Sequence, residues 1–185
     1  MNGDRILRIA RKTLREFVEN KQTFEMNEED LPDYFEEEKG VFVTLKKDGE
    51  LRGCMGLPYP DKKFLEALIR ASCSVTRDPR FKNLEKEELD HIDIEVTVLS
   101  KPEEIEVSNL QEAEEEIEIG EHGLILEKGG SSGLLLPQVA PDNAFDVEEF
   151  LEALSRKAGL SKESWKSPES VIKRFTARIF SESED

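Results

Sequence analysis

One short segment of the chain, LRGCMG at residues 51–56, places a fixed positive charge two residues from a thiol. If the segment is a strand, Arg52 and Cys54 share one face about 7 Å apart, close enough for the guanidinium to favour the thiolate over the thiol. Gly53 and Gly56 remove side chains beside the cysteine, so another backbone or a ligand can approach it. These residue types at this spacing fit two kinds of site: one in which Arg52 binds an anionic ligand, or one in which Cys54 acts as a nucleophile.

A structural interpretation of the same segment remains open. Cysteine is among the most frequently buried residue types, and glycine often marks a β-bulge. Arg52 could simply be paired with a carboxylate such as that of Asp78. The second cysteine, Cys73, lies inside a predicted helix and is expected to belong to the core.

Other polar residues could reach the same site. Asp78 and Arg80 follow a predicted helix in a turn, and Gln138 follows a predicted strand; such loop positions often carry binding residues. His122 begins an apolar strand and could act as an acid or base toward Cys54. Without geometry, the favoured alternative is a strand-end histidine bonded to the backbone.

The composition restricts the partners. The chain has 185 residues and a formal net charge of −16, so as a whole it repels nucleic acid and anionic lipid surfaces. There is no apolar run of the roughly 18 residues that span a bilayer, and the amino terminus does not have the pattern of a signal peptide. Two histidines and two cysteines without ligand spacing argue against a structural zinc site, and no cofactor motif is present. Acidic runs such as EEEIEIGE could supply oxygen ligands for magnesium, but such runs more often form a solvated face, so we expect no metal site. We expect one cytoplasmic domain, residues 1–185, with no nucleic acid or membrane partner.

Hydrophobic periodicity predicts helices and strands that do not alternate regularly. Helices are expected over residues 4–20, 61–77 and 146–158, with a short last helix from Ser167. Strands are expected in a hairpin around Asp48-Gly49, over 91–100, in a second hairpin over 122–140, and in the terminal RFTARIF. The acidic stretch 103–121 is expected to form short strands and one small helix. This order predicts an α+β fold with a mostly antiparallel sheet flanked by helices.

The Asp48-Gly49 turn also predicts the register of the first hairpin. Counting outward from a two-residue turn places Leu45 opposite Arg52 and Val43 opposite Cys54. Both faces of the hairpin carry apolar residues, so we expect a central element that is covered on both sides. Arg52 would then be largely desolvated and would need a carboxylate or an anionic ligand.

LRGCMG resembles the six-residue signature of the AMMECR family, with Met55 where isoleucine is typical. The resemblance continues through DPRF (78–81), IDIEVTVLS (92–100), GEHGLIL (120–126), LLLPQVA (134–140) and KAGL (157–160), with Trp165 beyond. It implies an α+β domain of two unequal lobes, with the signature near a cleft between them. It supplies no reaction, because the family has no established biochemical activity.

Two hypotheses follow for the function. The resemblance implies an accessory component that acts beside Memo-type and radical SAM proteins. On this hypothesis the chain binds a small-molecule or peptide ligand through Arg52, Gly53, Gly56, Asp78, Arg80 and Gln138. The alternative is an enzyme that acts on an anionic small molecule, with Cys54 as nucleophile and His122 as proton-transfer group.

Overall fold

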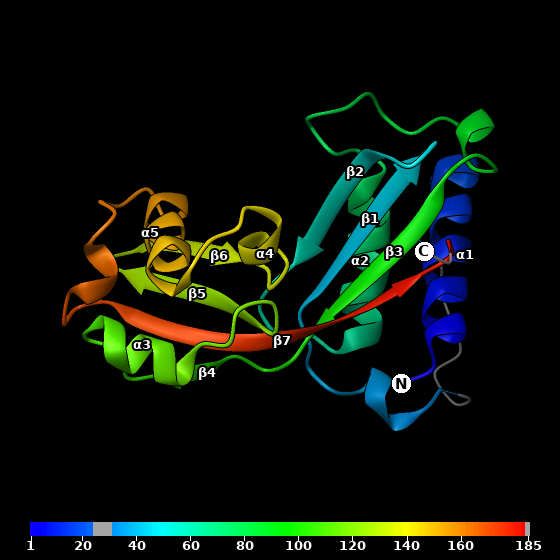
Figure 1. Cartoon of the computed structure of the whole chain (residues 1–185). Coiled ribbons are helices and arrows are strands. Elements are labelled where there is room, and N and C mark those ends of the chain that lie inside the picture. The colour runs from blue at the N-terminus through cyan, green and yellow to red at the C-terminus, as the bar shows by residue number, and fades with distance from the viewer. Residues whose placement is uncertain (24–30, 184–185) are drawn as a thin grey trace. The chain divides into compact units, whose positions relative to one another are not determined.

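The computed structural model describes residues 1–23 and 31–183, which belong to two compact units (Figure 1). Unit 1 comprises Met1–Leu99 and the chain from Arg178 onward, and unit 2 comprises Ser100–Ala177. All the strand pairings with a described register are antiparallel. The predicted α+β fold with a mostly antiparallel sheet is therefore confirmed, and the two units agree with the two unequal lobes.

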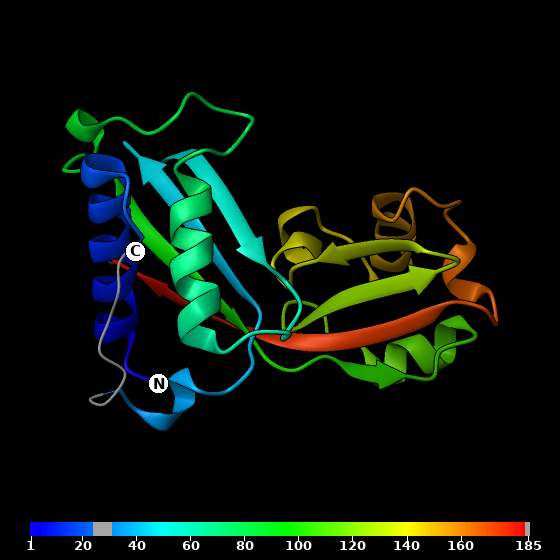
Figure 2. The same cartoon turned by 180° about the vertical axis from the view of Figure 1, so that it is seen from behind.

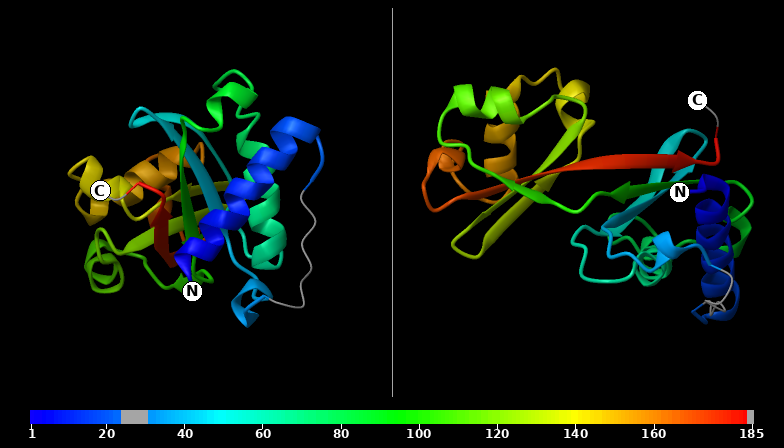
Figure 3. Two further views of the ribbon diagram at one scale, coloured as in Figure 1. Left: turned by 90° about the vertical axis from the view of Figure 1, so that its right-hand side faces the viewer. Right: turned by 90° about the horizontal axis from the view of Figure 1, so that it is seen from below.

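Unit 1 is a sheet with two helices packed on one face (Figure 2). Its strand order is β2-β1-β3, and the end of β7 lies beside β3. The left view of Figure 3 shows the helices α1 and α2 together against these strands. The elements are α1 (Gly3–Asn20), η2 (Asp33–Phe35), β1 (Val41–Lys47), β2 (Glu50–Leu57), α2 (Phe64–Val75), η3 (Lys86–Glu88), β3 (Asp93–Leu99) and the end of β7 (Val171–Ser181).

The helices of unit 1 form where the sequence places apolar residues at helical spacing. The side chain of Asn2 caps α1 by accepting a hydrogen bond from the Arg5 N–H at 3.1 Å. The buried face of α1 carries Ile6, Leu7, Ile9, Ala10, Thr13, Leu14 and Val18. Phe64 begins α2 and stacks on Phe35 with a ring-centroid distance of 5.3 Å. These apolar faces fix both helices on the sheet.

The end of β7 ties the chain's last described residues to its first half. Glu182 donates its N–H to the Ile94 carbonyl at 3.0 Å, and its carboxylate accepts the Ile94 N–H at 2.9 Å. The same carboxylate forms an ion pair with Arg11 of α1. A Cβ atom added to Gly3 would meet the Phe180 ring at 2.6 Å, so this ring packs directly on the first turn of α1.

Unit 2 has its own sheet and core. β7 pairs with β5, which pairs with β6, while β4 pairs with the other edge of β7 at Ile172, Lys173 and Arg174. Helix α5 packs on the β5–β6 hairpin (Figure 3), and its N-terminus is capped by Asp146, whose carboxylate accepts the Glu149 N–H at 2.8 Å. The elements are β4 (Glu103–Ile105), α3 (Leu110–Glu116), β5 (His122–Lys128), β6 (Ser131–Leu135), α4 (Val139–Asp142), α5 (Val147–Lys157), η4 (Ser164–Lys166) and the first part of β7.

Three expectations about the elements need correction. Strand β2 lies at the end of the strand order, so the first hairpin is an edge element and is not covered as a central one. The second helix extends from Phe64 to Val75 and not over the whole of residues 61–77. The predicted short last helix from Ser167 is wrong: a 3-10 turn ends at Lys166, and residues 167–170 form a non-helical connection to β7. Among the described residues, no helix has the length and apolar character needed to cross a membrane.

The close packing of β6 on α5 gives a stability prediction. A Cβ atom on Gly133 would lie 2.6 Å from the backbone nitrogen of Ala158, so Gly133→Ala must separate strand and helix. We expect a loss of about 1–3 kcal/mol in the free energy of unfolding, measured by urea denaturation. Gly3→Ala is the control, because its new methyl meets only the movable Phe180 ring. Equal stabilities for the two variants would show that the contact with Ala158 imposes no constraint.

Candidate functional site

The LRGCMG segment forms most of β2, but its register differs from the predicted one. Lys47 faces Glu50 as expected, yet Leu45 faces Gly53 and Thr44 faces Cys54. Arg52 is therefore the extra residue of a β-bulge. The predicted pairings of Leu45 with Arg52 and of Val43 with Cys54 are wrong, because a bulge shifts every later residue by one position.

The backbone of Cys54 is bound by the loop that follows α2. Its N–H donates to Asp78 Oδ2 at 2.9 Å, and its carbonyl accepts a hydrogen bond from Arg80 Nη2 at 3.3 Å. Both groups belong to the edge strand and point away from β1, where a further strand would otherwise bind. The Asp78–Arg80 pair thus closes the edge of β2 at the centre of the LRGCMG segment.

Asp78 is a buried carboxylate whose charge is fully compensated. Its side chain is 1% exposed, while that of Arg80 is 57% exposed. It accepts from the Arg80 N–H and Nε at 3.0 Å each and from Arg80 Nη2 at 2.7 Å, besides the Cys54 N–H. The Arg80 guanidinium, followed by these backbone N–H groups, holds the pKa of Asp78 well below its usual range. The carboxylate is therefore ionised at every physiological pH.

The two glycines of the segment have packing roles. A Cβ atom on Gly53 would lie 3.2 Å from the Val75 carbonyl oxygen, so the end of α2 lies directly on this strand. A Cβ atom on Gly56 would overlap the Phe42 ring and the Val41 carbonyl. The predicted close approach is thus made by the protein's own backbone and side chains at these two positions.

The two cysteines have different surroundings. Cys54 is half-buried, and its sulfur accepts a hydrogen bond from the Thr44 hydroxyl at 3.2 Å. Cys73 lies in α2, where burial raises the pKa of its thiol. Both are free thiols. The sequence pattern places Arg52 beside Cys54. In the structure, the arginine bonded to Cys54 is Arg80, which donates to its backbone carbonyl.

Arg52 forms a separate ion-pair group with Glu88. The guanidinium donates from Nε at 3.0 Å and from Nη2 at 2.8 Å to the two carboxylate oxygens, a bidentate arrangement. Lys47 donates to the same carboxylate at 3.0 Å. The side chains of Arg52 and Glu88 are 15% and 17% exposed, so the expected desolvation of Arg52 is confirmed, but its partner is Glu88 and not Asp78. Hydrogen bonds from Arg52, then Lys47, lower the pKa of Glu88 to about 2.

A cavity of about 440 Å³ lies beside this ion-pair group. Its lining includes three cations, Lys47, Arg52 and Lys82, and two carboxylates, Glu85 and Glu88. Phe81 and Asn83 complete it. The cavity therefore has a net positive lining in a protein whose formal net charge is −16.

Several residues of this site escape prediction from the sequence. Glu88 pairs with Arg52 across 36 positions, and no local pattern indicates that contact. The only signal at Glu88 is its spacing from Glu85, with which it forms a capping box around η3. Thr44 can likewise be identified as the partner of Cys54 only once the position of the bulge is known.

The remaining predicted residues, His122 and Gln138, belong to unit 2. His122 begins β5, and its Nδ1 accepts the Glu118 N–H at 3.0 Å, which matches the strand-end alternative. Gln138 precedes α4, and its carbonyl accepts the Asp142 N–H at 3.0 Å. Their roles toward Cys54 or a ligand stay predictions. Within the described residues, no group of three histidine, cysteine or acidic side chains could hold a metal ion.

The edge-closing role of Asp78 predicts a specific defect in Asp78→Asn. The amide cannot accept from four donors as the carboxylate does, and it leaves a buried N–H and the Arg80 charge poorly paired. We expect the free energy of unfolding to fall by about 2–4 kcal/mol in urea denaturation. Self-association, measured by sedimentation, should rise because the edge is open. Asp61→Asn, at an exposed aspartate of the same unit, is the control, and equal behaviour of the two variants would contradict this role.

Glu88 predicts a pH-dependent contribution to stability. Because its pKa falls from 4.5 to about 2 on folding, its contribution is complete above pH 4.5 and disappears as the pH falls toward 2. Glu88→Gln should therefore be less stable than the native chain by about 1–3 kcal/mol at neutral pH. This difference should vanish near pH 2 in urea titrations. A difference that stays constant across this range would show that the Glu88 charge does not stabilise the fold.

Comparisons with known proteins agree with the signature on which this site is built. A family model described as AMMECR1 matches residues 7–180. A protein of Methanothermobacter thermautotrophicus is 45% identical over 181 residues, covering 97% of this chain and 94% of its own length. Protein MK0488 of Methanopyrus kandleri is 44% identical over 186 residues, covering 98% of this chain and 89% of its own.

A solved structure has the same fold. The crystal structure of the uncharacterized protein PH0010 from Pyrococcus horikoshii matches with a TM-score of 0.88 and 40% identity. The match covers 98% of this chain and 91% of that chain. Family model, relatives and fold all coincide over nearly the whole sequence, and the chain belongs to the AMMECR1 family.

Proposed function

We propose that the chain is a cytoplasmic accessory module, one functional domain over residues 1–185, that binds an anionic small molecule in the cavity beside LRGCMG. The observation that carries this proposal is the hydrogen bonding of the Arg52 side chain. Its three hydrogen bonds to described residues use only Nε and Nη2, and they go to Glu88 and the Asn83 carbonyl. Among the described residues Nη1 has no partner, so two N–H groups of a rigid, largely buried guanidinium remain for a ligand.

The surroundings of Arg52 support an anion over a neutral ligand. Lys47 and Lys82 add two positive charges to the lining, and the Phe81 ring offers an apolar wall. Glu88 holds Arg52 and Lys47 in place before any ligand arrives, which reduces the entropy lost on binding. The volume of about 440 Å³ lies in the range of small-molecule sites.

The partner pathway is part of the same proposal. The family resemblance associates this chain with Memo-type and radical SAM proteins, which would supply the chemistry that the cavity lacks. The small molecule, or a peptide segment that carries an acidic group, would be held here and passed to such an enzyme. This step is supported by association within the family.

A second candidate function is an enzyme that uses Cys54 as a nucleophile. The observation that favours it is the Thr44 hydroxyl, which donates to the sulfur at 3.2 Å and would stabilise negative charge there. The bonds of Asp78 and Arg80 to the Cys54 backbone would hold the thiol rigidly.

Both candidates can be tested with two polyanions, citrate and inorganic pyrophosphate, in calorimetric titrations of the native protein. We expect binding of at least one probe, weakened about tenfold in Arg52→Gln because the positive charge and the two Nη1 N–H groups are lost. Arg52→Lys should be intermediate, since it keeps the charge without the planar guanidinium. The control is Arg70→Gln, which removes an exposed arginine paired with Glu66 on α2.

The outcomes separate the candidates. Binding that survives Cys54→Ser unchanged, without conversion of the probe, supports the accessory module. Conversion of a probe that is lost in Cys54→Ser supports the enzyme instead. If Arg52→Gln binds both probes as tightly as the native chain does, the cavity beside LRGCMG is not the anion site.

A further inference from the structure

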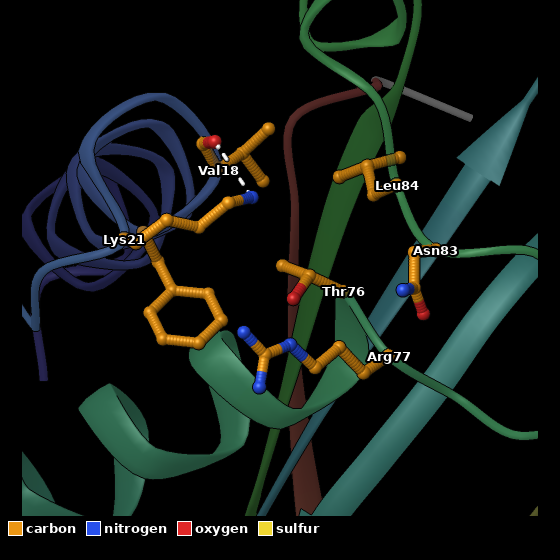
Figure 4. Close-up of a pocket in the computed structure, with 7 residues that line it drawn as sticks. Val18, Lys21, Thr76, Arg77, Asn83 and Leu84 are labelled. Carbon is orange, nitrogen blue, oxygen red and sulfur yellow. Dashed lines mark hydrogen bonds between the residues drawn. The ribbon is translucent and has the colours of Figure 1, made fainter.

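A second cavity, which we name the Lys21–Arg77 pocket, lies elsewhere in unit 1 (Figure 4). Its volume is about 180 Å³, and it opens between the ends of α1 and α2 and the segment at Asn83. Val18, Thr76 and Leu84 line it with buried side chains, and the half-buried Phe17 forms an aromatic wall. The cavity thus combines an apolar interior with the two cations for which we name it.

Within the described residues, the two cations are held in place by a backbone carbonyl and an aromatic ring. Lys21 has left-handed backbone geometry at the C-cap of α1, and its ammonium donates to the Val18 carbonyl at 3.1 Å. The Arg77 guanidinium carbon lies 4.8 Å from the centre of the Phe17 ring. Over residues 1–23 and 31–183, neither side chain forms an ion pair with a carboxylate. With respect to these described residues, both charges are available to an anion at the rim.

The helix ends supply a competing explanation for these charges. Both α1 and α2 point their C-terminal carbonyls toward this region, and cations are favourable at such ends by roughly 0.3–1 kcal/mol each. That effect accounts for two positive residues after the helices. It does not account for a cavity with an apolar lining beside them, nor for an arginine held against an aromatic ring.

We propose that the Lys21–Arg77 pocket binds a small aromatic carboxylate. An apolar cavity of about 150 Å³ is enough to hold a benzene ring, so a cavity of about 180 Å³ has room for one six-membered ring. The ring lies against Phe17, Val18 and Leu84, where it is removed from water. The carboxylate accepts from the Arg77 guanidinium and the Lys21 ammonium, and the Asn83 side chain lines the same opening.

This site is independent of the proposed function. The cavity beside Arg52 shares only Asn83 with it, and neither Lys21 nor Arg77 lines that cavity. A substitution of Arg77 therefore tests this pocket, while a substitution of Arg52 tests the other. Either site can fail without affecting the conclusion about its neighbour.

The test is a titration of the full chain with benzoate, followed by the amide NMR signals of Lys21, Arg77 and Asn83. We expect saturable shifts at these residues, and an affinity about tenfold lower in Arg77→Gln. Benzamide has the same ring without the charge, and it should bind about tenfold more weakly to the native protein. Arg70→Gln, which changes an exposed arginine of α2 outside the pocket, should bind benzoate as the native chain does.

Three results would overturn the proposal. The first is equal affinity for benzoate and benzamide, which would show that Lys21 and Arg77 do not bind the carboxylate. The second is equal affinity for benzoate in Arg77→Gln and the native chain. The third is an affinity for acetate equal to that for benzoate, which would mean that the apolar wall contributes nothing. The benzamide and acetate arms use only the native protein, so they decide the matter even if a variant does not fold.

Discussion

The bonds between one buried carboxylate and the edge of one strand organise the surface around LRGCMG. A strand at the end of a sheet leaves backbone N–H and C=O groups without a neighbouring strand to bond them. In unit 1, side chains form these bonds at Cys54. Asp78 accepts the N–H, and Arg80 donates to the carbonyl while also neutralising Asp78. Since the Asp78 side chain is 1% exposed, its charge and the position of the loop depend on each other.

Fixing the loop at Asp78 also places the residues that follow it. From Phe81 to Glu88 the chain supplies most of the lining of the cavity beside Arg52, and Glu88 closes that lining against the guanidinium. Arg52, within LRGCMG, and Arg80, which contacts it, thus have different roles. Arg80 donates a hydrogen bond to the backbone carbonyl of Cys54. Arg52 binds Glu88 through Nε and Nη2, so its Nη1 is available to a ligand.

Most of the fold is predictable from the sequence because it depends on local periodicity. The apolar spacing in residues 3–20 and the Asp48-Gly49 turn are enough to predict α1 and the first hairpin. The bulge at Arg52 is not predictable in this way, since it depends on how Gly53 fits under the end of α2. One inserted residue is enough to exchange the faces of a strand, and this is why the sequence pairs Cys54 with Val43 while the structure pairs it with Thr44.

The candidate site shows the same division between local and distant contacts. Its members Arg52, Cys54, Asp78 and Arg80 are visible in the sequence through their unusual types and spacing. Their partners are not: the sequence offers Asp78 for Arg52, but the structure pairs Asp78 with Arg80 two residues away and Arg52 with Glu88. Nothing in a linear pattern distinguishes these carboxylates, because the choice is made by the fold of the loop.

The route of β7 has a consequence for how the protein is made. The end of β7 and the residue after it complete unit 1, since the Phe180 ring packs on Gly3 and Glu182 bonds to Ile94 and Arg11. On the ribosome these residues emerge only after all of unit 2 has been synthesised. The first half of the nascent chain must therefore wait for the final strand, with the outer edge of β3 unpaired and with Arg11 bonded only to the Leu89 and Ile92 carbonyls. Unit 2, by contrast, is contiguous in sequence and can fold as soon as residue 177 has left the exit tunnel.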